Sequence, residues 1–190
     1  MFLLQRRALI AAAATLASAP LARKPHAAAG SGPAPMTAPE LGRLKPSAGT
    51  PLPEFTFTLP DGTVQSIADY AGKGIVLNLW ATWCVPCVAE MPALDALAAA
   101  VAAANVVVLP LSSDRGGAAA VARFYKERSI RHLPIVLDPQ GAASRALGAR
   151  GIPTTVLIDS AARERGRMEG GADWASKESI AMVKALVQTG

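Results

Sequence analysis

Two hydrophobic patterns alternate along the second two-thirds of the chain. Short, nearly continuous apolar runs, typical of strands buried on both faces, occur at residues 75–80 and 106–111, and a strand is also predicted at 154–158. Apolar residues at helical spacing predict helices over 85–104, 117–128, 142–147 and 176–188. Alternation on both sides of Pro60-Asp61-Gly62 predicts a β-hairpin over 54–67.

Two further strands are expected, at 132–137 and at 164–169. The second is predicted at the sheet edge, where its alternating charges would discourage aggregation. Strands that alternate with helices favour a central sheet between helices. The sequence therefore predicts an α/β fold with a mixed β-sheet flanked by helices and an N-terminal β-hairpin extension.

The first fifty residues lack these patterns. Residues 23–50 are rich in Pro, Ala and Gly and have no apolar period, which predicts a flexible tether. The folded domain is therefore expected over 51–190.

Residues 1–22 have the layout of an export signal. A basic start is followed by an apolar stretch that ends in Ala17-Ser18-Ala19. Cleavage after Ala19 or Ala22 would release the chain, whereas an uncleaved segment would anchor it in a membrane. The pair Arg6-Arg7 fits a twin-arginine signal as well as an ordinary basic start. We expect a periplasmic protein, either soluble or anchored to the inner membrane.

The net charge of +5 belongs to this leading part of the chain. Residues 1–52 hold six basic residues and one acidic residue, whereas residues 53–190 hold 13 of each. The expected domain is thus neutral, and the charge gives no support to a nucleic-acid partner.

Cys84 and Cys87 are the only cysteines, and they lie where a predicted strand meets a predicted helix. A bridge over so short a loop would restrain the unfolded chain little, so it is a poor structural staple. The histidines, His26 and His132, give no zinc-ligand spacing. The remaining interpretation is a redox-active disulfide, with no other cofactor expected.

The helix start gives the two cysteines different expected roles. Unpaired N–H groups and the helix dipole stabilise a thiolate at this place, so Cys84 is expected to be exposed and activated. Cys87, one turn inside the helix, would attack the mixed disulfide formed on Cys84. Val85 and Pro86, between them, are expected to tune the reduction potential.

Pro153 opens a predicted buried strand after a glycine-containing turn, which makes Ile152–Pro153 a candidate for a cis peptide bond. A trans proline that only begins the strand is the alternative. A cis bond would place the Ile152 backbone beside the sulfur atoms, where a substrate peptide can lie.

The sequences Trp80-Ala81-Thr82-Trp83-Cys84-Val85-Pro86-Cys87 and Gly151-Ile152-Pro153-Thr154-Thr155 together resemble the thioredoxin superfamily, in particular its TlpA/ResA/CcmG branch. Residues 171–176 further resemble TlpA proteins. The resemblance implies a thioredoxin-like fold, a cis Pro153 and thiol-disulfide exchange on proteins. It also implies a role in cytochrome c maturation or in copper-site assembly of oxidases.

One position departs from cytosolic thioredoxins, which carry a buried acid where this chain has Asn78. Glu90, one turn after Cys87, is a substitute that resembles the glutamate of ResA-type reductases. Partial burial would raise its pKa toward a value suited to general acid/base catalysis. The alternative is an ordinary solvated glutamate on the helix.

The docking face is expected to include Trp83, Val85, Pro86, Ile152 and Thr154. Trp80 and Trp174 are interpreted as packing residues, and His132 as packed or on the surface. The expected partners are proteins that carry disulfides and, as electron donor, a membrane thiol transporter of the DsbD/CcdA type. We expect a monomer.

Three other functions compete with a disulfide reductase. A peroxiredoxin-like peroxidase would need a threonine where the chain has Ala81. A copper-binding assembly module would use both cysteines and a histidine. A DsbA-like oxidant would run the same chemistry in the opposite direction, and only the resemblance argues against it.

Overall fold

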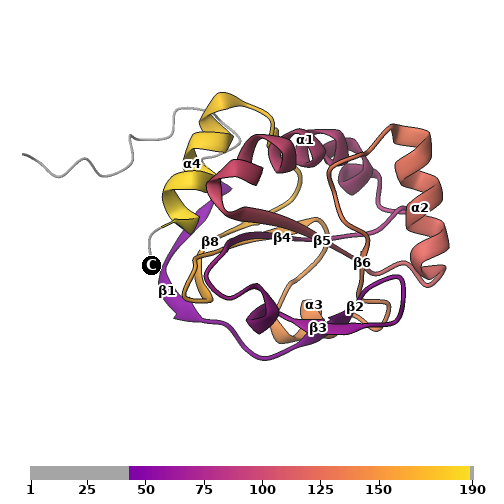
Figure 1. Cartoon of the computed structure of the whole chain (residues 1–190), viewed down its shortest axis with the longest axis horizontal. Coiled ribbons are helices and arrows are strands. Elements are labelled where there is room, and N and C mark those ends of the chain that lie inside the picture. The colour runs from indigo at the N-terminus through magenta and orange to yellow at the C-terminus, as the bar shows by residue number, and fades with distance from the viewer. Residues whose placement is uncertain (1–42, 189–190) are drawn as a thin grey trace, which may run out of the picture. The chain divides into compact units, whose positions relative to one another are not determined.

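The computed structural model describes residues 43–188, which form one sheet between two layers of helices (Figure 1). The strands are β1 (Lys45–Pro51), β2 (Thr56–Thr58), β3 (Val64–Ser66), β4 (Gly74–Trp80), β5 (Val106–Ser112), β6 (Val136–Leu137), β7 (Thr154–Ile158) and β8 (Arg163–Glu169). The helices are α1 (Val85–Val101), α2 (Gly117–Arg128), α3 (Ala142–Ala146) and α4 (Lys177–Val187), with short 3-10 turns at Ile67–Tyr70 and Ala102–Ala104.

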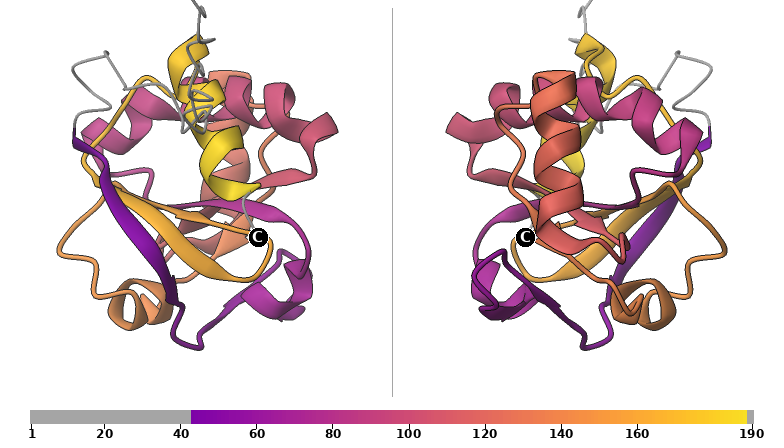
Figure 2. Two further views of the ribbon diagram at one scale, coloured as in Figure 1. Left: turned by 90° about the vertical axis from the view of Figure 1, so that its left-hand side faces the viewer. Right: turned by 90° about the vertical axis from the view of Figure 1, so that its right-hand side faces the viewer.

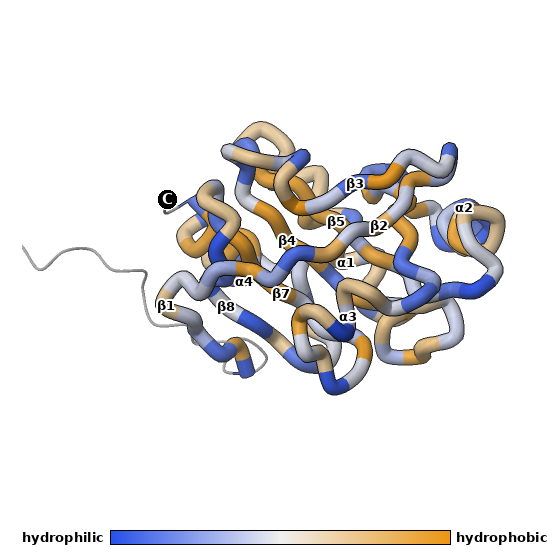
Figure 3. Tube along the Cα trace, turned by 90° about the horizontal axis from the view of Figure 1, so that it is seen from below, coloured by the Kyte–Doolittle hydropathy of each residue, from blue (hydrophilic) through white to orange (hydrophobic). Residues whose placement is uncertain are grey.

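The eight strands lie in the order β1-β8-β7-β4-β5-β6-β2-β3. β4, β5 and β6 are parallel to one another, and the remaining pairs are antiparallel. β4 is central and every one of its residues is buried, as its continuous apolar run predicted. Figure 3 shows the hydrophobic colour along this strand and hydrophilic colour on β8. The predicted thioredoxin-like α/β fold with a mixed sheet is confirmed.

Alternate residues of β4 supply the two halves of the core. Val76 and Trp80 face α1, α2 and α4, whereas Ile75, Leu77 and Leu79 face α3 and the β2–β3 hairpin. Figure 2 shows these two helical layers on opposite sides of the sheet. Because successive side chains of a strand point to opposite faces of the sheet, the residues of β4 contribute to both halves of the core.

Strand β1 corrects the predicted domain boundary. Lys45–Pro51 pairs antiparallel with β8, whereas the sequence predicts a flexible tether over most of this segment. Its register shifts between Pro46 and Thr50, and Gly49 adopts φ +94°. Prolines and a bulge are tolerated because this is an outer strand, where backbone pairing needs no apolar pattern. The predicted export signal, and the predicted tether up to residue 42, lie outside the described residues.

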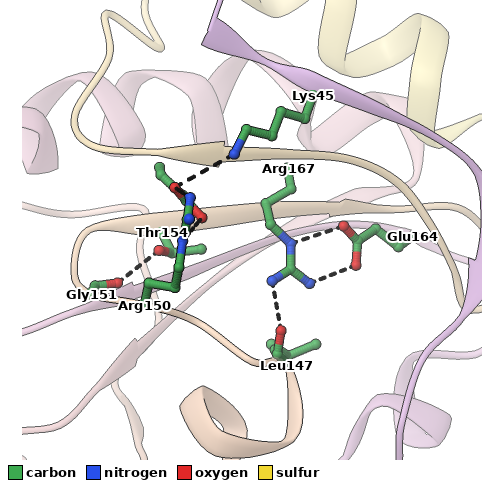
Figure 4. Close-up of polar contacts among 8 residues, drawn as sticks. Lys45, Leu147, Arg150, Gly151, Thr154, Glu164 and Arg167 are labelled. Carbon is green, nitrogen blue, oxygen red and sulfur yellow. Dashed lines mark hydrogen bonds and ion pairs between the residues drawn. The ribbon is translucent and has the colours of Figure 1, made fainter.

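As a second correction, β8 is not an edge strand, because β1 covers it. Its charges form ion pairs: Arg167 contacts Glu164 and donates to the Leu147 carbonyl, while Arg150 and Lys45 contact Glu169 (Figure 4). The strand predicted over 132–137 is also shorter, since only Val136–Leu137 pairs. The three N–H groups of 131–133 instead donate to the carboxylate of Asp95.

Gly74 lies directly against the last turn of α4. A Cβ at Gly74 would lie 2.5 Å from Val187 Cγ2 and 3.0 Å from the Val187 carbonyl oxygen. The last turn of α4 therefore packs directly on the β4 backbone, and only glycine leaves enough room.

We predict that Gly74→Ala lowers the free energy of unfolding by about 1 to 3 kcal/mol through overpacking. Denaturant unfolding measures this change. The control is Gly151→Ala, because a Cβ there meets nothing within 4 Å and the residue has no positive φ. Equal stability of the two variants would contradict the packing argument.

Candidate active site

A disulfide between Cys84 and Cys87 lies at the start of α1. Cys84 is the N-cap residue, and its sulfur accepts a hydrogen bond from the Cys87 N–H at 3.3 Å. Cys84 is 6 % exposed and Cys87 is fully buried. An incoming sulfur atom can therefore reach Cys84 more readily than Cys87. The expectation of an exposed Cys84 is corrected, because Cys84 is itself buried and only the order of access agrees with the sequence.

The residues around Cys84 form an exposed apolar rim. Trp83 is 68 % exposed and Val85 is 80 % exposed. Pro86 lies in the first turn of α1, where its missing N–H removes no intrahelical bond. Large exposed apolar side chains of this kind are typical of contact surfaces for other proteins.

The loop before β7 faces this rim. The Ile152–Pro153 peptide bond is cis, and the Ile152 carbonyl oxygen lies 3.8 Å from Cys84 Sγ. The Thr154 side chain is buried and donates to the Gly151 carbonyl at 2.7 Å (Figure 4). Thr154 thus fixes the loop from inside, which corrects its predicted place on the docking face.

Glu90 lies one helical turn after Cys87 and is only 4 % exposed. Its Oε1 accepts from Asn78 Nδ2 at 2.9 Å. Its Oε2 accepts from the Ala172 N–H and from Trp174 Nε1, both at 3.1 Å. The expectation of a buried glutamate is met, and the alternative of a solvated one is excluded.

Burial raises the pKa of Glu90, because a charged carboxylate is poorly solvated inside the domain. The three donors, and the positive charge of Arg43, act in the opposite direction and limit the rise. The carboxyl is therefore held between two opposing influences, a condition that suits a group that exchanges protons.

Two residues bind the Glu90 carboxyl in a way that the sequence does not reveal. Trp174 is fully buried, as a packing residue would be, but its indole N–H also binds the carboxylate. Asn78 donates to Glu90 and to Thr155 Oγ1, and its own Oδ1 is buried without a partner. Glu90 and Trp174 are 84 positions apart in the sequence, so no local pattern reveals the contact.

A groove of about 640 Å³ is lined on one side by Trp83, the residue before Cys84. Its other lining residues come from the loops that follow β5 and β6, and include Arg115 and Gln140. Its floor is fixed by buried Asp114, which accepts from the Thr82 N–H, the Thr82 hydroxyl and the Ser112 hydroxyl. A second groove lies around α3, and residues of 52–56 and 142–146 line it.

Within residues 43–188, no three side chains of the His, Cys, Asp or Glu type come together as a metal site would require. His132 is exposed. The arrangement thus brings together a disulfide, a carbonyl group beside it and a buried carboxyl.

These features define the class of protein: a thioredoxin-like domain with a cysteine pair at the start of its first long helix. The family comparison agrees, since residues 47–181 match the Redoxin family. The chain belongs to this family, within the TlpA/ResA/CcmG-like part of the thioredoxin superfamily.

Named relatives are similar over the same region. The thiol-disulfide oxidoreductase ResA of Geobacillus thermodenitrificans is 34 % identical over 113 residues, which are 60 % of this chain and 64 % of ResA. The thioredoxin-like protein YneN of Bacillus subtilis is 31 % identical over 58 % of this chain and 65 % of its own. The chain thus spans slightly less than two thirds of the length of these relatives.

Solved structures share the fold. A thiol:disulfide interchange protein of Chlorobium tepidum superposes with a TM-score of 0.58 and 25 % identity, over 74 % of this chain and 99 % of its own. A secreted thiol-disulfide isomerase of Corynebacterium glutamicum gives a TM-score of 0.64 with 20 % identity, over 78 % and 95 % of the two chains.

The raised pKa of Glu90 predicts a pH dependence of stability. The folded chain binds a proton more tightly than the unfolded chain, so the free energy of unfolding falls as pH rises. The fall begins near the ordinary glutamate pKa of about 4.3 and ends above the raised pKa of the folded state. For one proton the slope is at most about 1.4 kcal/mol per pH unit.

Glu90→Gln removes the pH-dependent contribution of Glu90 to the free energy of unfolding. The difference in this free energy between parent and variant should therefore vary with pH between the ordinary and the raised pKa of Glu90. Denaturant unfolding at a series of pH values measures both. Asp138, whose pKa burial also raises, contributes equally to both proteins and cancels in the difference. Parallel curves across the window would show that Glu90 is not a high-pKa group.

Proposed function

We propose that this protein is a periplasmic thiol-disulfide oxidoreductase that reduces disulfides of other proteins. The observation that carries the proposal is the Cys84–Cys87 pair, whose outer sulfur caps α1 and lies 3.8 Å from the Ile152 carbonyl oxygen. A substrate peptide can lie along this carbonyl with its disulfide against Cys84. The names of the ResA relatives support the same chemistry.

The reaction begins with both cysteines reduced. The Cys84 thiolate attacks one sulfur of the substrate disulfide, forms a mixed disulfide and releases the other sulfur as a thiolate, which takes up a proton. The N–H of Cys87 and the helix dipole stabilise the attacking thiolate, since they place positive charge beside it.

The second step returns the disulfide seen in the structure. Cys87 loses its proton and attacks Cys84, so the second substrate sulfur leaves as a thiolate and is protonated. Glu90 accepts the Cys87 proton, because it lies one turn away in a buried setting that raises its proton affinity. Two electrons and two protons pass to the substrate, and a dithiol donor must then restore them.

The donor and the substrates follow from the resemblance described above. A membrane thiol transporter of the DsbD/CcdA type supplies electrons, and the substrates belong to cytochrome c maturation or to copper-site assembly of oxidases. The export-signal layout of residues 1–22 supports a location in the periplasm.

Substitution of each cysteine tests the mechanism. In the full chain, Cys84→Ser should lower the rate of substrate disulfide reduction to background, because the attacking sulfur is lost. Cys87→Ser should accumulate a mixed disulfide with a protein substrate, because nothing resolves it. The double variant is the control and should trap nothing. Full activity of Cys84→Ser would rule out the proposed attack.

The reduction potential of the Cys84–Cys87 couple tests the direction. A reductase should have a potential at or below about −200 mV, whereas a DsbA-like oxidant would lie near −120 mV. Equilibration of the full chain with glutathione buffers, followed by thiol alkylation, gives the value. A potential near that of the oxidant would reverse the proposed direction while leaving the exchange chemistry in place.

A further inference from the structure

Arg43, just before β1, contacts the loop that closes over Glu90. Its Nη2 donates to the carbonyl oxygen of Gly171. Its Nη1 lies 3.1 Å from the place of a Cβ on Gly170, whose φ is +87°. Figure 2 shows the beginning of β1 at the same end of the domain as the connection from β8 to α4. The guanidinium therefore rests on a stretch of backbone where glycine leaves space for it.

The peptide group that Arg43 binds is the same one that binds Glu90. The carbonyl of Gly171 and the N–H of Ala172 belong to a single planar unit, and this N–H donates to Glu90 Oε2 at 3.1 Å. A cation at the carbonyl end polarises the amide, which makes its N–H a stronger donor. It also holds the peptide dipole with its positive end toward the carboxylate.

The other side of this peptide is equally confined. A Cβ on Gly171 would lie 3.5 Å from Glu90 Oε2 and 3.5 Å from the Pro86 carbonyl oxygen. The peptide is thus packed against the first turn of α1, next to the cysteine pair. A change in the orientation of this peptide group would therefore directly change its hydrogen bond to the Glu90 carboxyl.

We propose that Arg43 is a positioning residue that sets the proton affinity of Glu90 through the Gly171–Ala172 peptide group. The arm formed by Arg43 and β1 is then part of the active site, although it lies outside the region expected to fold. Its consequence for catalysis rests on the proton role proposed above for Glu90, but its effect on Glu90 itself does not.

Other charges near this carboxyl do not replace Arg43. Asp95 lies farther along α1, Asp173 lies in the loop, and α4 carries Lys177, Glu178 and Lys184. The positive charge of Arg43 lowers the pKa of Glu90. Cys84 and Cys87 titrate only when reduced, so the disulfide form isolates the effect.

The test is the titration of the Glu90 carboxyl by carbon-13 NMR in the oxidised full chain, with Glu90→Gln to assign the signal. Arg43→Gln should increase the proton affinity of Glu90 roughly two- to fivefold, the size typical of an exposed charge interaction. Arg43→Lys, which keeps the charge, should restore part of the difference. Added salt should reduce the gap between parent and Arg43→Gln.

Arg123→Gln is the matched control, because Arg123 is an exposed arginine on α2 and its loss changes the net charge equally. Equal titrations of Glu90 in Arg43→Gln and Arg123→Gln would overturn the proposal.

A second measurement covers the case in which Arg43→Gln loosens the arm. Its effect on unfolding free energy is compared in the parent and in Glu90→Gln, above and below the Glu90 titration. A purely structural arm gives the same loss in both backgrounds at every pH, which would contradict the proposal. A loss that depends on ionised Glu90 supports it.

The titration also separates this proposal from the catalytic one. A shifted Glu90 titration with unchanged disulfide reduction in Glu90→Gln would support the positioning role of Arg43 and overturn the proton role of Glu90. The reverse pattern, a loss of reduction in Glu90→Gln with no shift in Arg43→Gln, would overturn the positioning role alone.

Discussion

The carboxyl of Glu90 depends on hydrogen bonds from segments that are distant in the sequence. β4 supplies Asn78 and the loop before α4 supplies Ala172 and Trp174, while α1 carries the glutamate itself. An isolated carboxylate in such a place would be costly, whereas three donors make it tolerable. The same bonds tie α1, one turn after the cysteine pair, to β4 and to the loop before α4.

The two cysteines of the disulfide differ in their exposure because they lie at different positions at the start of α1. Cys84 caps α1 and keeps slight exposure, whereas Cys87 points into the core beside the elements that surround Glu90. A partner can thus meet only the sulfur that the helix N-terminus activates. In the mechanism proposed above, the inner sulfur passes its proton to Glu90, which lies one helical turn further along α1. Access and proton transfer are therefore separated on two sides of one helical turn.

The α/β architecture and the cysteine site could be predicted because local patterns carry them. The apolar run of β4, the spacing of α1 and the CxxC spacing between Cys84 and Cys87 need no knowledge of distant contacts. Glu90 was found because it lies one turn from Cys87 on the same helix. Trp174 and Arg43 were missed as site residues because only the tertiary fold brings them near the carboxyl. The resemblance of residues 171–176 to TlpA proteins covers Trp174 but does not indicate its contact with Glu90.

The missed strand β1 has a specific physical cause. Outer strands are held by backbone hydrogen bonds on one side and need few apolar residues. A strand that contains Pro and Gly therefore has the same sequence pattern as a flexible tether. The error matters for the chemistry, because Arg43 enters the site through this segment. Asn78 and Trp174 bind Glu90 as neutral, buried donors that salt cannot screen. Arg43 acts from the surface, and its share of the control over Glu90 therefore responds to ionic strength and to whatever contacts the arm.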